Sequence, residues 1–148
     1  MTLPERVGAA SEMRSWAGSI PLRYEYTAGV AGEVFLRGLK EGRILAGYCP
    51  SCRSAALPAR TYCVDCFTAT SEFVPAGPVG LVKAVTRKKG AGGETVSFGF
   101  VEFPGTKGGL VHRLLPGVRA GSKVRAVFKA KARRRGAVSD IAGFERAV

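Results

Sequence analysis

Long apolar runs, histidine and cysteine are all scarce in this chain of 148 residues. No apolar stretch approaches the roughly 18 residues that a membrane-spanning helix needs. Residues 1–14 mix charged and small side chains, so they lack the apolar segment of a secretory signal. We therefore expect a soluble, cytoplasmic protein with no membrane partner.

Side chains for catalysis are also few. The single histidine, His112, lies between Val111 and Arg113 in a predicted strand, and no GxSxG serine or cysteine outside the CxxC pairs could act with it. The carboxylates in the second half of the chain form no suggestive pair: Glu94, Glu102 and Asp140. We predict that the chain is not catalytic alone; whether it serves an enzyme as a subunit stays open.

Acidic residues are scarce relative to basic ones. The chain has 23 Lys and Arg against 11 Asp and Glu, a net charge of +12. From Lys83 to Arg135 the only acids are Glu94 and Glu102. Such a field attracts nucleic acid, phosphorylated cofactors or an acidic protein face, although solubility alone would also explain it.

The four cysteines form two CxxC pairs, Cys49 with Cys52 and Cys63 with Cys66. Two intervening residues let one tight turn direct both sulfurs at a single ion, and two such turns make a tetrahedral Cys₄ site suited to Zn²⁺. The ten residues between the pairs are fewer than the usual 15–20 or so, but they suffice for a short hairpin. The spacing predicts one zinc ion.

Other uses of these cysteines remain to be weighed. Iron is the main metal alternative, and disulfides are less favoured because a cytosolic chain keeps its thiols reduced. A redox dithiol would need only one CxxC, usually beside a βαβ unit, which this pattern lacks. Because four cysteines fill every ligand position, the metal is expected to be structural rather than catalytic.

An extended arm and a short helix precede the cysteines. The arm carries Trp16, Tyr24 and Tyr26, aromatic side chains that are expected to pack on this chain or on a partner. Residues 30–41 predict a helix that stops at Gly42, with Phe35 and Leu39 in its apolar stripe. That stripe could pack on the chain's own ribbon or dock on a partner protein, and both possibilities stay open.

Five strands are predicted after the cysteines, over residues 79–87, 95–103, 110–115, 123–131 and 139–145. Strands with turn signals at this spacing suit a small closed or partly open barrel. Val96, Phe98 and Phe100 share one face of their strand, and we expect this face to lie in the barrel core. The chain is therefore predicted to be mostly β.

Two basic loops could hold phosphate groups. One carries Lys88 and Lys89 in a glycine-rich segment, and the other carries three consecutive arginines: Arg133, Arg134 and Arg135. Neither has the pattern of a nucleotide-binding P-loop, and each could be a solvated loop. A ribbon followed by a basic barrel also raises the hypothesis of single-stranded nucleic-acid binding, against which stands the expected burial of the phenylalanines.

The order of arm, helix, ribbon and barrel resembles a known family. Residues 35–45, the two CxxC pairs and the intervening segment 57–60 look like the zinc-ribbon/OB-fold acyl-CoA-associated family, long catalogued as a domain of unknown function. Weaker matches cover residues 77–82, 120–128 and 141–144. Arg53 stands where ribbon turns often have glycine, so that turn is expected to be strained or differently shaped. The resemblance implies an arm and docking helix over 1–46, a rubredoxin-like ribbon over 47–70 and an OB-fold barrel over 71–148.

Family members usually accompany a thiolase or a thiolase-like aldolase. The resemblance implies a non-catalytic subunit that docks on a thiolase-like large subunit, in a hetero-oligomer around a thiolase dimer, and helps form its CoA or acyl-CoA channel. Anaerobic aromatic degradation, steroid side-chain breakdown and mevalonate-type synthesis are the implied settings. The basic residues of the two loops would bind CoA phosphates, and the aromatic arm with Phe35 and Leu39 would dock. A stand-alone acyl-CoA-binding protein is a further alternative.

Overall fold

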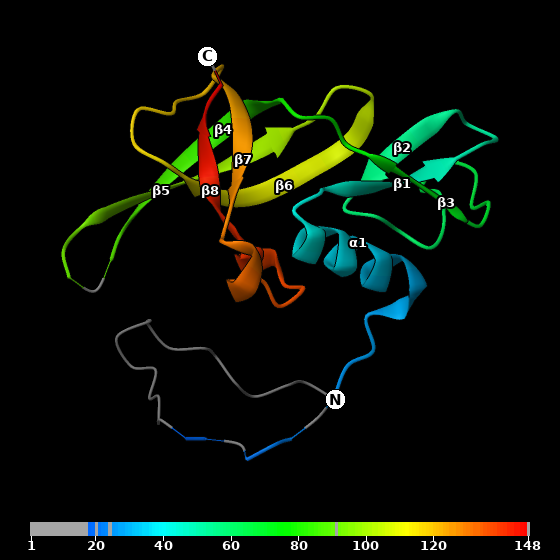
Figure 1. The fold of residues 1–148 in the computed structure, drawn as a ribbon, viewed down its shortest axis with the longest axis horizontal. Helices are drawn as coiled ribbons and strands as arrows, with labels where there is room; N and C mark the ends of the chain where they lie inside the picture. Colours follow the sequence, from blue (N-terminus) through cyan, green and yellow to red (C-terminus); the bar gives the residue numbers. More distant parts are fainter. Residues whose placement is uncertain (1–17, 20, 24, 91, 148) are drawn as a thin grey trace, which may run out of the picture.

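The computed structural model describes residues 18–19, 21–23, 25–90 and 92–147. Helix α1 comes first and is followed by eight strands and two short 3₁₀ helices, η2 and η3 (Figure 1). In chain order these elements are α1 (Gly29–Glu41), β1 (Leu45–Cys49), β2 (Ser54–Leu57), β3 (Glu72–Pro75), β4 (Gly80–Lys89), β5 (Thr95–Glu102), β6 (Thr106–Leu114), β7 (Lys123–Phe128), η2 (Lys131–Arg133), η3 (Val138–Asp140) and β8 (Ile141–Arg146). No helix in these described ranges is long and apolar enough to cross a membrane.

Helix α1 ends as its sequence predicts. Gly42 takes the left-handed conformation, with φ of 83°, and its N–H reaches the carbonyl groups of Gly38 and Leu39. Glycine adopts this conformation without the steric cost that a Cβ brings, so the chain turns here into β1. Phe35 and Leu39 are buried in the main core, which fastens the helix to the rest of the chain.

The ribbon is a three-stranded antiparallel sheet in which β1 pairs with both β2 and β3. Strand β2 also pairs in parallel with the start of β6, where Ala56 lies opposite Lys107. The sequence predicted the β6 strand only from residue 110, because Gly108 and Gly109 weaken the strand signal before it. The longer strand makes the ribbon and the barrel parts of one sheet.

The predicted five-stranded barrel is confirmed. Strand β4 pairs with β5, β5 with β6, β6 in parallel with β8, β8 with β7, and β7 with β4, which closes the ring in the strand order of an OB-fold. Its fully buried side chains include Val82, Val101, Val124 and Phe144. Apolar burial therefore holds the barrel together.

The expected burial of Val96, Phe98 and Phe100 in the barrel core is wrong. Gly99 and Val101 are the buried residues of β5, and because side chains alternate along a strand, the two phenylalanines lie on the outer face. A Cβ at Gly99 would come 2.7 Å from Cδ1 of the buried Leu114. The narrow interior has room for glycine and valine there, so the more apolar face of β5 points outward.

Candidate metal centre

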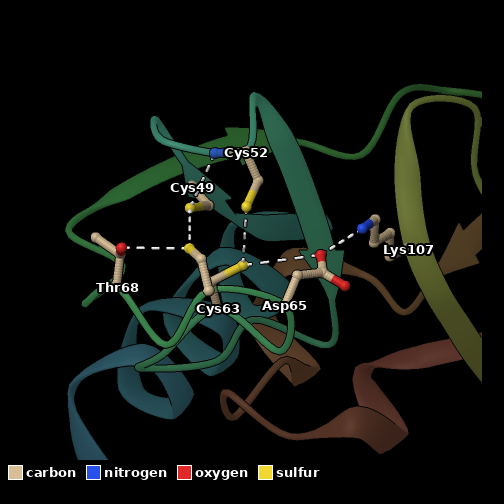
Figure 2. A network of polar contacts seen from close by, with 7 residues as sticks. Cys49, Cys52, Cys63, Asp65, Thr68 and Lys107 are labelled. Atoms are coloured by element: carbon tan, nitrogen blue, oxygen red, sulfur yellow. Dashed lines mark hydrogen bonds and ion pairs between the residues drawn. The ribbon is translucent and has the colours of Figure 1, made fainter.

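The two CxxC pairs converge on one point. The sulfur atoms of Cys49, Cys52, Cys63 and Cys66 all lie within 4.8 Å of one another (Figure 2). Sγ of Cys49 is 3.5 Å from Sγ of Cys66, and Sγ of Cys63 is 3.8 Å from Sγ of Cys52. Four sulfurs around a tetrahedral zinc, each with a bond of about 2.3 Å, would be about 3.8 Å apart. The donor set therefore fits a structural Zn²⁺.

Both cysteine turns share an unusual backbone feature. Arg53 and Phe67, which directly follow the second cysteine of each pair, have φ of 50° and 58°. Residues other than glycine rarely adopt this left-handed backbone conformation, so the backbone is strained at both positions. The expectation of strain at Arg53 is confirmed. Phe67 was missed, although it occupies the equivalent place after the second CxxC.

The second turn is closed by backbone hydrogen bonds. Cys63 N–H donates to the Thr68 carbonyl over 2.9 Å, and Phe67 N–H donates to the Cys63 carbonyl over 3.1 Å. In the first turn, Cys52 N–H donates to Sγ of Cys49 over 3.5 Å. Local hydrogen bonding therefore helps orient the sulfurs toward one another.

Two of the thiols, Cys52 and Cys66, differ widely in pKa. Hydrogen bonding with Thr68, whose Oγ1 is 3.2 Å from Sγ of Cys66, lowers the pKa of Cys66 to about 6. Hydrogen bonding with Cys66, together with burial, raises the pKa of Cys52 to about 12. Zinc needs thiolate ligands, so its binding should release protons, chiefly from thiols such as Cys52.

An ion pair links the second turn to the barrel. The side chain of Lys107 on β6 contacts the carboxylate of Asp65, which lies 3.9 Å from Sγ of Cys63 (Figure 2). Hydrogen bonding with Asp65 raises the pKa of Lys107. Together with the β2–β6 pairing, this contact ties the metal site to the start of β6.

A basic cavity lies beside the loop between β7 and β8. Arg133 and Arg135 line a cavity of about 680 Å³, together with Lys129 and Ser139. Arg134 points elsewhere: its Nε donates to the Lys129 carbonyl over 2.7 Å, and its guanidinium lies 5.4 Å from the centroid of the Phe128 ring. The structure therefore brings two of the three predicted arginines together.

The other predicted phosphate ligands lie apart from this cavity. Lys88 and Lys89 are exposed at the end of β4, where the β4–β5 hairpin projects from the barrel (Figure 1). Neither lines the basic cavity. The two basic loops thus do not form one site.

Asp140 organises the arginine loop, a role that sequence reasoning missed. Its carboxylate is buried and accepts backbone N–H groups of Arg135, Gly136 and Ala137 over 2.7 to 3.1 Å. Burial by itself would raise the pKa of Asp140, but these donors outweigh it and lower the pKa. The only signal in the sequence was an acid close after three arginines.

The predicted docking residues have different fates. Phe35 and Leu39 are buried in the chain's own core, so their assignment to a partner interface is corrected: α1 packs on this chain. Tyr26 is 86% exposed, whereas Trp16 and Tyr24 lie outside the described residues. Two residues that were not predicted, Leu22 and Val30, are also largely exposed near Tyr26 in sequence.

His112, the single histidine, lies outside the cysteine site. In the described part of the chain, the four cysteines form the one group of three or more His, Cys, Asp and Glu side chains that could hold a metal ion. His112 places its ring edge-on to Phe144, with 6.0 Å between centroids, and its Nε2 lies 3.3 Å from the Val138 carbonyl oxygen. His112 therefore contacts the barrel core and the β7–β8 loop.

Comparisons with known proteins agree with this geometry. A family model described as the ChsH2 rubredoxin-like zinc ribbon domain matches residues 37–72. A crystal structure of a DUF35-family protein of unknown function from Sulfolobus solfataricus is 32% identical, with a TM-score of 0.62, over 70% of this chain and 81% of that one. The structure of the Ltp2-ChsH2(DUF35) aldolase is 18% identical, with a TM-score of 0.59, over 78% and 93%. No curated protein sequence matches the chain.

The fold and the cysteine site define a protein in which a rubredoxin-like zinc ribbon is joined to a closed five-stranded barrel. The identity to the Sulfolobus protein, over most of its length, then places the chain more narrowly. The chain belongs to the DUF35 family.

Proposed function

We propose that this protein is a non-catalytic subunit of a thiolase-like enzyme that acts on CoA thioesters. The observation that carries the proposal is the architecture shared with the Ltp2-ChsH2(DUF35) aldolase, whose name joins a DUF35 chain to a second protein. In this account the large subunit supplies the reacting groups.

The arm before α1, together with the first turn of that helix, is the proposed docking segment. Leu22, Tyr26 and Val30 are 68%, 86% and 69% exposed. Large apolar side chains that gather in one exposed segment are typical of surfaces that bind another protein. The proposed docking surface therefore consists of residues that come before Phe35 and Leu39 in the sequence, and it does not include these two buried residues.

The basic cavity is the proposed contact with CoA. Guanidinium groups suit phosphates because they donate several hydrogen bonds in one plane and stay charged. Arg133 and Arg135 line the cavity, and Asp140 orients the backbone at Arg135 and Gly136. Lys129 adds a third cation. CoA has a diphosphate and a 3′-phosphate that such a cluster could bind.

Assembly is tested by co-expression with candidate thiolase-like proteins from the same organism. The zinc-loaded chain should co-elute with one of them in size-exclusion chromatography. Leu22→Glu combined with Val30→Glu should abolish co-elution, because it places charges in the docking segment. Ala120→Glu, at an exposed loop position, is the matched control and should leave it intact. A chain that elutes alone at micromolar concentration would contradict the proposal.

CoA contact is tested within the assembled enzyme. Arg133→Ala combined with Arg135→Ala should raise the apparent KM for the CoA thioester about tenfold, since each lost charged contact weakens binding by about 1 kcal/mol or less at an exposed site. Arg119→Ala, an exposed arginine in the β6–β7 loop, should leave KM unchanged. An unchanged KM in the double variant would show that the loop is only a solvated surface.

A further inference from the structure

The outer face of β4, β5 and β6 carries two aromatic side chains that the barrel core does not use. Strand pairing places Ala84, Phe100 and Val111 in one row across this face. The next row holds Thr86, Phe98 and Arg113. Both phenylalanines are half-buried and lie outside the core cluster, while Val111 is 68% exposed.

A shallow apolar depression runs between these rows. It has a volume of about 170 Å³ and is lined by side chains from all three strands, including Thr86, Phe98, Phe100 and Val111. A Cβ at Gly109 would lie 3.0 Å from Cζ of Phe100, so the glycine leaves space that the ring occupies. The face is therefore shaped around Phe98 and Phe100.

Two cations lie near the Phe98 end of this depression. Lys88 and Arg113 lie on the same face, are exposed, and form no ion pair with any described residue. Lys83, by contrast, is paired with Glu102. At a net charge of +12, repulsion disfavours a second copy of this chain as the occupant, whereas a polyanion is attracted.

We propose that this face binds single-stranded nucleic acid. Phe98 and Phe100 are two residues apart on one strand, about 6.6 Å, which allows each ring to stack with a separate base of an extended strand. Lys88 and Arg113 then neutralise flanking phosphates. The face of the second and third barrel strands is where OB-folds bind oligonucleotides, and here these strands are β5 and β6. This activity does not depend on the proposed role in a thiolase complex.

The test is fluorescence anisotropy of a labelled 15-nucleotide oligothymidine, titrated with the full zinc-loaded chain across a series of salt concentrations. Phe98→Leu and Phe100→Leu should each weaken binding about tenfold, because leucine fills the depression but does not stack. Phe67→Leu, which alters an exposed phenylalanine on the zinc ribbon, is the matched control and should bind as the wild type does. Zinc content and thermal unfolding confirm that each variant is folded.

Charge variants supply a second readout that does not disturb packing. Arg113→Ala should reduce the slope of log affinity against log salt by about 0.7, as expected for one lost phosphate contact on a single strand. Arg119→Ala, an exposed arginine beyond β6, should leave that slope unchanged. Thr86→Asp puts a carboxylate in the exposed row beside Phe98 and should weaken binding even if a phenylalanine variant fails to fold.

Three results would overturn the proposal. In the first, the wild-type chain fails to bind the oligonucleotide. In the second, the folded phenylalanine variants and Thr86→Asp bind it as tightly as the wild type does, which would leave only non-specific charge attraction. In the third result, the same variants lose assembly with the thiolase-like subunit and keep their affinity for the oligonucleotide. The face would then be a protein interface, and the proposed function would stand without this one.

Discussion

The zinc ribbon and the barrel achieve order by different means. From residue 61 to residue 69 of the ribbon, only Cys63 is buried, and Tyr62 and Phe67 are 60% and 78% exposed. In the barrel, Val101 and Phe144 are fully buried. The ribbon loop thus lacks an apolar core of its own and depends on its cysteine site, whereas the barrel depends on apolar burial. Strands β1 and β2 of the ribbon contribute Ala46, Ala55 and Leu57 to the same core as the barrel, so the contrast is between the ribbon loop and the rest of the chain.

Removal of zinc should have the largest effect, and it should affect the ribbon loop much more than the barrel. A structural zinc site contributes about 10–16 kcal/mol in zinc-finger peptides, so a strong chelator should unfold the ribbon loop over residues 61–69. In hydrogen exchange, amides of the second cysteine turn should lose protection while those of β5 and β8 keep it. Elemental analysis should find one zinc per untreated chain. Equal loss of protection in β5 and β8 would show that the barrel also depends on the metal.

Removing a large side chain should destabilise the protein far more in the barrel core than on the ribbon. Phe144→Ala removes a fully buried ring from the barrel and should cost about 3–5 kcal/mol in the free energy of unfolding, measured by urea titration. Phe67→Ala, at an exposed position on the ribbon, should change it by about 0.5 kcal/mol or less. Comparable losses in the two variants would break the distinction between the regions.

Low pH should destabilise the β7–β8 loop because it protonates Asp140. Its folded pKa lies below the usual value of 3.8, so its stabilising contribution is present above that value and is lost as the pH falls through the folded pKa. Asp140→Asn should therefore lower the melting temperature by a few degrees at pH 7. The difference from the wild type should shrink as the pH falls below 4. A difference that stays constant with pH would show that the carboxylate charge is irrelevant.

The smallest expected effect is at the strained turns of the ribbon. Arg53→Gly or Phe67→Gly relieves the strain of a non-glycine residue in the left-handed backbone conformation, which should stabilise the folded state by about 1 kcal/mol. The greater conformational freedom of glycine in the unfolded chain offsets part of this gain. Each variant should raise the melting temperature of the zinc-loaded protein slightly. Arg60→Gly, at a position without positive φ, should lower it or leave it unchanged. A lower melting temperature in both turn variants would mean that these side chains make stabilising contacts.

Much of the fold follows from local patterns. The CxxC spacing predicted convergence of the four sulfurs, Gly42 predicted the end of α1, and alternating segments predicted the barrel strands. These features depend on residues within a few positions of one another, so the sequence carries their signal directly.

The features that were missed depend on residues far apart in the chain. The parallel β2–β6 pairing joins segments about fifty residues apart, and nothing local encodes it. The outward position of Phe98 and Phe100 was missed because their face is the more apolar one, while Leu114 of the neighbouring strand fills the inner space at Gly99. The buried Asp140 depends on backbone donors that only the folded loop presents.

The central claim is that this chain serves a thiolase-like enzyme. The most direct measurement is the CoA-thioester turnover of a thiolase-like protein that co-elutes with the chain, titrated with the zinc-loaded chain. We predict that kcat/KM rises and saturates at a fixed ratio of the two proteins. Turnover and KM that stay unchanged at micromolar concentrations of the chain would contradict the account.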